Sequence, residues 1–176
     1  MVAIQVGRDI LDFVNTDAVR QHVLKTYRPT AVAIVENEKG RILLVKSAKG
    51  SYWGFPQGGV EESEEVVQAL LRELEEEVGI VAADVDVRTY CLTERLDTPH
   101  ARKGFLYGKQ YYYFHVGYRG SSRIVLQREE VSDYCWLSRH RAAEFINGLN
   151  ERYRKKKLGM LAALSKLPRA SNGAHH

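Results

Sequence analysis

The sequence contains few of the residues that mark specialised classes of protein. Two cysteines occur among 176 residues, Cys91 and Cys135, and they show neither metal-ligand spacing nor the number that a disulfide framework needs. No stretch approaches the roughly 18 uninterrupted apolar residues with which a helix crosses a bilayer. The N-terminal segment carries Arg8, Asp9 and Asp12 where a signal peptide is apolar. We therefore expect a cytoplasmic protein with reduced cysteines and no membrane partner.

The overall composition is that of an ordinary globular domain, since hydrophobic residues make up 44% and charged residues 27% of the chain. The net charge of +4 hides a separation of sign along the sequence. Residues 61–77 contain eight acidic side chains against the single basic Arg72, whereas residues 139–169 contain nine basic side chains against two acidic ones. A charged run is most simply a solvated surface, and this interpretation suffices for the basic segment. The acidic run needs a further explanation.

Hydrophobic periodicity predicts three helical regions. Residues 64–78 place their apolar side chains on one helical face and stop at Gly79. A basic helix is expected after Ser138, which can cap it, and this helix is weakened at Gly148. Residues 9–26 have the spacing of one or two short amphipathic helices.

Alternating apolar residues predict the strands of a mixed sheet flanked by helices, which is an α/β fold. The expected strands are residues 30–36, 41–46, 85–93, 110–118 and 123–126, with a short one at Trp136 and Leu137. In the fourth of these, Tyr112 should lie on one face and Tyr111 and Tyr113 on the other. The predicted divisions of the chain are a helical appendage at 1–26, the main domain at 27–150, and a basic C-terminal helix and tail at 151–176.

Three glutamates crowd together on the helix predicted at residues 64–78. At about 100° per residue, Glu73, Glu76 and Glu77 fall on one stripe beside the apolar face. Like charges at this spacing destabilise a helix by roughly a few tenths of a kcal/mol per pair unless something neutralises them. Oxygen ligands without a neighbouring histidine or cysteine favour Mg²⁺ or Mn²⁺ over zinc. From the helix alone, a divalent metal site and a solvated acidic face both remain open.

The residues around this helix form a longer pattern. Gly58 and Gly59 precede it and permit a close approach of the backbone. Residues 58–80 read GGVEESEEVVQALLRELEEEVGI. They fill every fixed position of the 23-residue Nudix box, namely Gly58, Glu64, Arg72, Glu73, Leu74, Glu76, Glu77, Gly79 and Ile80. The chain therefore resembles the Nudix hydrolases.

This resemblance implies an α/β/α sandwich, of the Nudix type at residues 27–150, that hydrolyses nucleoside diphosphates linked to another group. It implies Mg²⁺ as the cofactor, with Mn²⁺ as the alternative. By resemblance, the divalent ions are held by Glu73, Glu76, Glu77 and a carbonyl of Gly58 or Gly59. Glu64 is implied to pair with Arg72 and to fix the loop against the helix. The implied general base is Glu73 or a glutamate further along the chain, and the sequence does not choose between them.

Further motifs resemble one branch of the family, the RNA 5′ pyrophosphohydrolases and the related diadenosine tetraphosphate hydrolases. These motifs are YRPTAVAIV from Tyr27, WGFPQGG from Trp53, GKQYYYF from Gly108 and EVSDYCWLS from Glu130. In this branch the arginine of the first motif contacts substrate phosphates, which assigns that role to Arg28. The last motif assigns an acidic ligand or base to Glu130, with Glu129 as the neighbouring alternative. The resemblance extends from Tyr27 to Phe145.

Three further cations are candidates for substrate contacts. Lys109 and Arg95 could bind phosphate, although a lone cation is most often part of the surface. The loop at residues 96–107 carries Lys103 among other basic and aromatic side chains. Such a loop fits a phosphate or base contact and a plain surface loop equally well.

The motifs favour one function and leave alternatives. The first expectation is a Mg²⁺-dependent pyrophosphohydrolase that acts on the 5′-triphosphate or diphosphate end of RNA. Diadenosine polyphosphates are the alternative substrate, and free nucleoside triphosphates are a third. A catalytically silent module that binds a nucleotide or RNA is the alternative of another class. Such modules usually lose box glutamates, whereas this sequence keeps them. The sequence does not predict an oligomeric state.

Overall fold

The described part of the chain is built around one mixed sheet. The computed structural model describes residues 27–50, 52–97, 108–120 and 123–168, so the appendage expected at 1–26 lies outside it. The strands are β1 (Tyr27–Asn37), β2 (Arg41–Ser47), β3 (Trp53–Gly54), β4 (Gln57–Gly59), β5 (Val85–Asp97), β6 (Gly108–Tyr118) and β7 (Val131–Ser138). The strand order is β3-β2-β1-β6-β5, with β4 paired to β1 and β7 paired to β2.

Strand β1 organises the centre of this sheet. It runs parallel to β6 along its whole length, from the pair Tyr27 and Gly108 to the pair Asn37 and Tyr118. It turns back into β2 through Gly40, whose φ of 66° suits a glycine. The side-chain oxygen of Asn37 accepts hydrogen bonds of 3.0 Å from the backbone N–H groups two and four residues on. The turn is therefore held by the residue that ends the strand.

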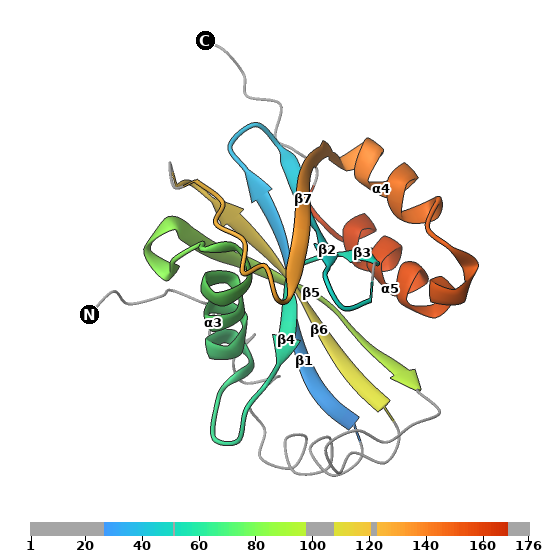
Figure 1. Cartoon of the computed structure of the whole chain (residues 1–176), viewed down its shortest axis with the longest axis horizontal. Coiled ribbons are helices and arrows are strands. Elements are labelled where there is room, and N and C mark those ends of the chain that lie inside the picture. Colours follow the sequence, from blue (N-terminus) through green and yellow to red (C-terminus); the bar gives the residue numbers. More distant parts are fainter. Residues whose placement is uncertain (1–26, 51, 98–107, 121–122, 169–176) are drawn as a thin grey trace.

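Helices cover both faces of the sheet, which gives the expected α/β/α sandwich (Figure 1). They are α3 (Val66–Val78), α4 (Arg139–Asn147) and α5 (Arg154–Ser165), with short 3₁₀ turns at Ala82–Asp84 and Glu151–Tyr153. Helix α3 lies on one face, and α4 and α5 lie on the other. Within the described ranges no helix is long and apolar enough to cross a membrane. The cytoplasmic location stays a prediction.

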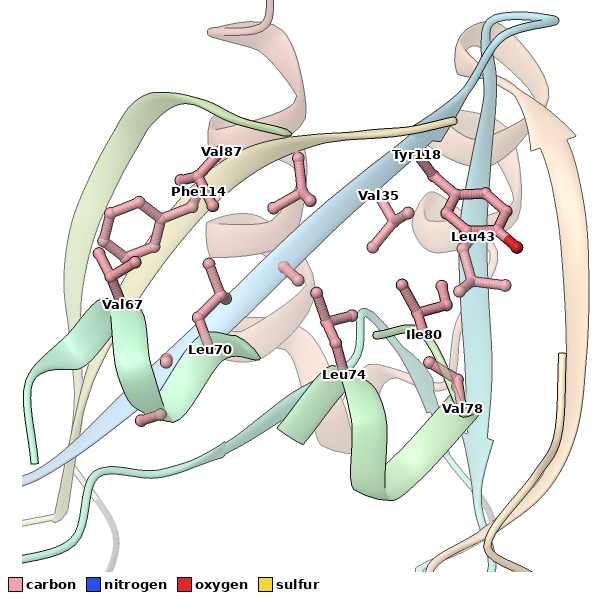
Figure 2. Packing of buried hydrophobic residues seen from close by; sticks show 14 of the residues in the cluster. Val35, Leu43, Val67, Leu70, Leu74, Val78, Ile80, Val87, Phe114 and Tyr118 are labelled. Carbon is pink, nitrogen blue, oxygen red and sulfur yellow. The ribbon is translucent and has the colours of Figure 1, made fainter. Parts of the chain in front are cut away.

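Successive side chains of the central strands point to opposite faces of the sheet and so contribute to two separate hydrophobic cores. On β1, Val35 belongs to the core under α3, and Ile34 belongs to the core under α4 and α5. Tyr112 lies in the first core, while Tyr111 and Tyr113 lie in the second, so the predicted faces are confirmed. The first core is filled from α3 by apolar side chains one turn apart, which meet those of the sheet (Figure 2). These side chains from α3 are Val67, Leu70, Leu74 and Val78.

The second core depends on the C-terminal part of the chain. Ser138 caps α4 as predicted, because its side-chain oxygen accepts from the backbone N–H of Arg141. The helix stops at Gly148, and α5 begins only at residue 154, so the basic helix expected from the sequence is two helices. Helix α5 buries apolar residues against the sheet, among them Met160, Ala163 and Leu164. It comes close to β5 at Gly159, where an added Cβ would lie 1.4 Å from a carboxylate oxygen of Glu94.

Several elements differ from the sequence predictions. The strand expected at 123–126 is wrong, since these residues form neither strand nor helix. Val125 N–H donates instead to the carbonyl of Val78, and Gln127 N–H donates to that of Glu77, so the segment satisfies the open end of α3. Helix α3 begins at Val66 rather than Glu64, after a capping box in which Glu65 is the N-cap. Strand β7 is longer than the two residues expected.

Leu70→Ala tests the packing of α3 on the sheet. The side chain is 1% exposed, so its truncation leaves a cavity and should lower the free energy of unfolding by about 2–5 kcal/mol. Urea denaturation measures this change. Glu75→Ala, at an exposed position of the same helix, should change it by less than about 0.5 kcal/mol. Equal effects of the two substitutions would contradict the packing described here.

Candidate functional site

Three carboxylates from two distant parts of the chain meet beside the end of α3. Oxygens of Glu73, Glu77 and Glu130 all lie within 4.8 Å of one another. The first two lie one turn apart on α3, and the third comes from the residue before β7. Backbone hydrogen bonds hold the approach to β7 in place, since the N–H of Gln127 donates to the carbonyl of Glu77 and that of Ala48 donates to the carbonyl of Glu130.

Glu77 is the buried member of this cluster. It is 9% exposed and accepts a 3.0 Å hydrogen bond from the backbone N–H of Gln57. Burial raises its pKa from 4.5 to about 8, and repulsion by the other two carboxylates adds to the effect of burial. The hydrogen bond from Gln57 opposes this rise but does not cancel it. A divalent cation would stabilise the charged form, so the donor chemistry and the electrostatics both fit a hard metal ion.

Arg72 ties the loop before α3 to the carboxylates. Its guanidinium binds both carboxylate oxygens of Glu64, at 2.8 and 2.9 Å. It also donates to the carbonyl of Gly59 at 3.0 Å and to a carboxylate oxygen of Glu73 at 2.7 Å. The pKa of Glu64 is lowered, first by the hydrogen bonds from Arg72. Glu73 is thus oriented from one side, while burial raises its pKa against the pull of Arg72.

The two glycines before the helix are needed for close approach. A Cβ on Gly58 would lie 1.7 Å from the carboxyl carbon of Glu73. A Cβ on Gly59 would lie 2.2 Å from the guanidinium of Arg28. Because Arg72 already uses the carbonyl of Gly59, the carbonyl of Gly58 is the better candidate for a metal ligand.

The carboxylates open into a cavity of about 500 Å³ that also contains cations. Arg28, Lys49 and Lys109 line it together with the glutamates. Lys49 lies 4.0 Å from Glu130. A cavity that carries both carboxylates and cations suits a polyanion bound through a metal ion, because each sign of charge finds its partner.

The other residues predicted to belong to the site do not all line the cavity. Glu76 lines the cavity, but its oxygens lie outside the three-carboxylate cluster and one of them binds Arg72 at 3.0 Å. Arg95 does not line the cavity; it donates to Gln110 and lies 5.0 Å over the ring of Tyr27. Glu129 is an exposed turn residue. Lys103 falls outside the described residues.

The sequence patterns did not single out Lys49 or Tyr52, which also line this cavity. Neither position belongs to the box, and both precede β3 in a stretch without periodicity. Long-range backbone contacts, namely the pairing of β3 with β2 and the hydrogen bond from Ala48 N–H to the carbonyl of Glu130, bring this stretch next to the carboxylates. Spacing along the sequence therefore could not have revealed them.

Comparison with known proteins identifies the family. The profile of the NUDIX domain matches residues 26–160, which is more than half of the chain. The chain therefore belongs to the Nudix family of hydrolases. This membership agrees with the box and with the sandwich described above.

Curated relatives are named RNA pyrophosphohydrolase. The protein of Halorhodospira halophila is 51% identical over 61 residues, which are 35% of this chain and 34% of the relative. The chain thus spans about a third of the length of that relative. The protein of Pseudomonas paraeruginosa is 30% identical over 122 residues, which are 64% of this chain and 77% of the relative.

Solved structures share the fold at lower identity. An Ap4A hydrolase binary complex from C. elegans superposes with a TM-score of 0.60 at 19% identity and covers 78% of this chain and 93% of its own. The dihydroneopterin triphosphate pyrophosphohydrolase of E. coli superposes with a TM-score of 0.63 at 22% identity and covers 81% and 97%. At these identities the likeness confirms the fold class and says nothing of the substrate.

Gly58→Ala tests the close approach of the glycine loop to Glu73. The added methyl should push the flexible carboxylate out of the cluster and lower the affinity for Mn²⁺ by about tenfold or more. Stability should change little, because a side-chain end can move aside. Isothermal titration measures the affinity. The control is Gly148→Ala, where the nearest atoms lie at 3.5 Å; an equal loss there would contradict the assignment.

The raised pKa of Glu77 predicts a pH dependence of stability. Between pH 4.5 and about 8 the folded, metal-free protein keeps a proton that the unfolded chain has released. Its stability should therefore fall as the pH rises through this window. Glu77→Gln cannot titrate, so its melting temperature in EDTA should fall less steeply with pH. Parallel curves for the two proteins would show that Glu77 has an ordinary pKa.

Proposed function

We propose that this Nudix protein is a Mg²⁺-dependent pyrophosphohydrolase that acts on the 5′-triphosphate or diphosphate end of RNA and leaves a monophosphate. Family membership supports hydrolysis of a phosphoanhydride. The relatives named RNA pyrophosphohydrolase support the RNA end as substrate, since one of them aligns over 122 residues. Mn²⁺ is the alternative cofactor.

One observation carries this proposal. The oxygens of Glu73, Glu77 and Glu130 converge within 4.8 Å in a cavity that Arg28 and Lys109 also line. A silent binding module would have no use for a carboxylate whose pKa is raised by burial and, to a lesser extent, by neighbouring carboxylates. The convergence therefore favours an enzyme over a binding module.

The residues divide into holders of the ion and a base. Glu73, Glu77 and the carbonyl of Gly58 would hold the divalent ion, with Glu76 as a further ligand at the edge of the cavity. When bound, the ion neutralises the phosphate charge and lowers the pKa of a coordinated water. Glu130 is the better placed base, because its side chain is half-exposed and so meets water. Glu73 is the alternative, but its hydrogen bond to Arg72 favours the charged form and occupies one oxygen.

Two cations would bind the phosphate chain. Arg28 lies at the start of β1 with its guanidinium packed over Gly59, and Lys109 is its register partner on β6. Both side chains line the cavity beside the carboxylates. They can thus bind the oxygens of a phosphate chain that the metal ion does not neutralise. Arg95 and Lys103 stay predictions as substrate contacts.

The function is tested by a competition of substrates with Mg²⁺. A 5′-triphosphorylated RNA oligonucleotide, diadenosine tetraphosphate and free nucleoside triphosphates are assayed side by side. The RNA should have the highest kcat/KM, with a 5′-monophosphate end as product. Glu77→Gln should lower kcat by about 100-fold because it weakens the metal site, whereas Glu75→Gln, at an exposed position of the same helix, should not.

Each other outcome contradicts a different part of the proposal. A higher kcat/KM for the dinucleotide or for free triphosphates would contradict the RNA end as the substrate. Absence of turnover of all three by a folded, metal-loaded protein would favour the binding module. Full activity of Glu77→Gln would contradict the metal assignment.

A further inference from the structure

The first turn of helix α5 contains three consecutive lysines after Arg154, and their side chains have three different environments. Successive residues of a helix point about 100° apart, so a run of like residues cannot face one direction. Lys155 is exposed. Lys157 is buried and donates to the carbonyls of Asn147 and Leu149 in the link between the helices. Lys156 is partly exposed and contacts residues that line the cavity holding the carboxylates, although it is not one of the lining residues itself.

The ammonium of Lys156 contacts residues that line this cavity. Its Nζ lies 3.8 Å from the ring centroid of Tyr52, over the face of the ring. It also lies 3.6 Å from the position that a Cβ on Gly54 would occupy. Tyr52 and Gly54 both line the cavity. Helix α5 thus reaches the site from the face of the sheet opposite α3.

No ion pair within the described part of the chain compensates the positive charge of Lys156. Among the described residues it makes no hydrogen bond or ion pair, and its contact is the face of an aromatic ring. Burial, with a smaller contribution from repulsion by Lys109, lowers its pKa from 10.5 to about 7. The attraction of Glu77 opposes these effects without offsetting them. An anion bound beside Lys156 would stabilise the charged form of this lysine.

The charge of Lys109 indicates which kind of anion would bind near Lys156. Its side chain lines the cavity whose wall Lys156 contacts, and its positive charge lowers the pKa of Lys156. Two ammonium groups that repel each other are both stabilised when an anion with several oxygens binds near them. A phosphate chain that extends from the carboxylate-bound metal ion would be such an anion.

We propose that Lys156 binds a phosphate oxygen of the substrate together with Lys109, so that the C-terminal helix forms part of the substrate site. The inference rests on the proposed function to the extent that the site takes a phosphate chain. It does not require that the chain belongs to RNA. Lys156 would then have a specific role within the basic C-terminal segment, whereas its exposed neighbour Lys155 would have none.

A binding role and a purely structural role make opposite predictions for Lys156→Met. Methionine keeps an unbranched apolar stem against Tyr52 and removes a poorly solvated charge, so a binding role predicts an unchanged or raised melting temperature. If Lys156 served only to support Tyr52, the melting temperature would fall and ligand affinity would not change. The two roles are therefore separated by measuring stability and affinity on the same protein.

The experiment measures binding of inorganic pyrophosphate in the presence of Mg²⁺ by isothermal titration. Lys156→Met should weaken binding by about tenfold, and it should raise KM for the triphosphorylated RNA more than it lowers kcat. Lys156→Arg, which keeps the charge, should restore most of the affinity. Lys155→Met removes the same charge from the exposed neighbour and should leave affinity and KM unchanged.

The outcomes separate this inference from the proposed function. If the wild-type protein leaves RNA intact but binds pyrophosphate in a manner that depends on Lys156, the RNA proposal fails and the inference holds. If RNA is hydrolysed while Lys156→Met binds pyrophosphate as the wild type does, the inference is overturned. It is also overturned if Lys156→Met fails to fold, or if Lys155→Met weakens binding equally.

Discussion

The hydrogen bonds of Arg72 are the interaction on which the geometry of the site depends. A single guanidinium joins Glu64, the carbonyl of Gly59 and two carboxylates of α3, so one side chain fixes the loop, the helix and the ligand set relative to one another. Arginine suits this position because its planar donors bind a carboxylate through two bonds and retain donors for other acceptors. The like charges of Glu73 and Glu76 are thereby tolerated on one helix.

A second constraint is the space between the glycine loop and α3. Strand β4 pairs with β1 and brings Gly58 against Glu73, where any side chain would collide with the carboxylate. The backbone of the loop therefore lies directly against the carboxylate of Glu73. This closeness buries Glu77 and raises its pKa, so the packing that stabilises the fold also sets the protonation of a carboxylate in the proposed metal site.

Hydrophobic periodicity was sufficient to predict most helices and strands, and the motif at residues 58–80 was sufficient to recognise the Nudix box. Periodicity identified the face of α3 and the alternating tyrosines of β6, because these depend on repeats of a few residues. The strand expected at 123–126 failed because its backbone bonds to the end of α3, a contact that no local pattern encodes. Lys156 lay in a run interpreted as a solvated surface, since composition does not show which lysine of three turns inward. Arg95, expected in the site, is instead engaged by Tyr27 and Gln110.

We propose that Glu73 and Glu77 of α3 hold one divalent metal ion, with Glu130 from the approach to β7 beside it. Crystals soaked in Mn²⁺ and measured near the manganese absorption edge test this claim most directly. We expect an anomalous peak coordinated by oxygens of Glu73 and Glu77, with Glu130 beside it. Absence of a peak at these carboxylates at saturating Mn²⁺, or ordered Mn²⁺ bound only elsewhere on the chain, would contradict it.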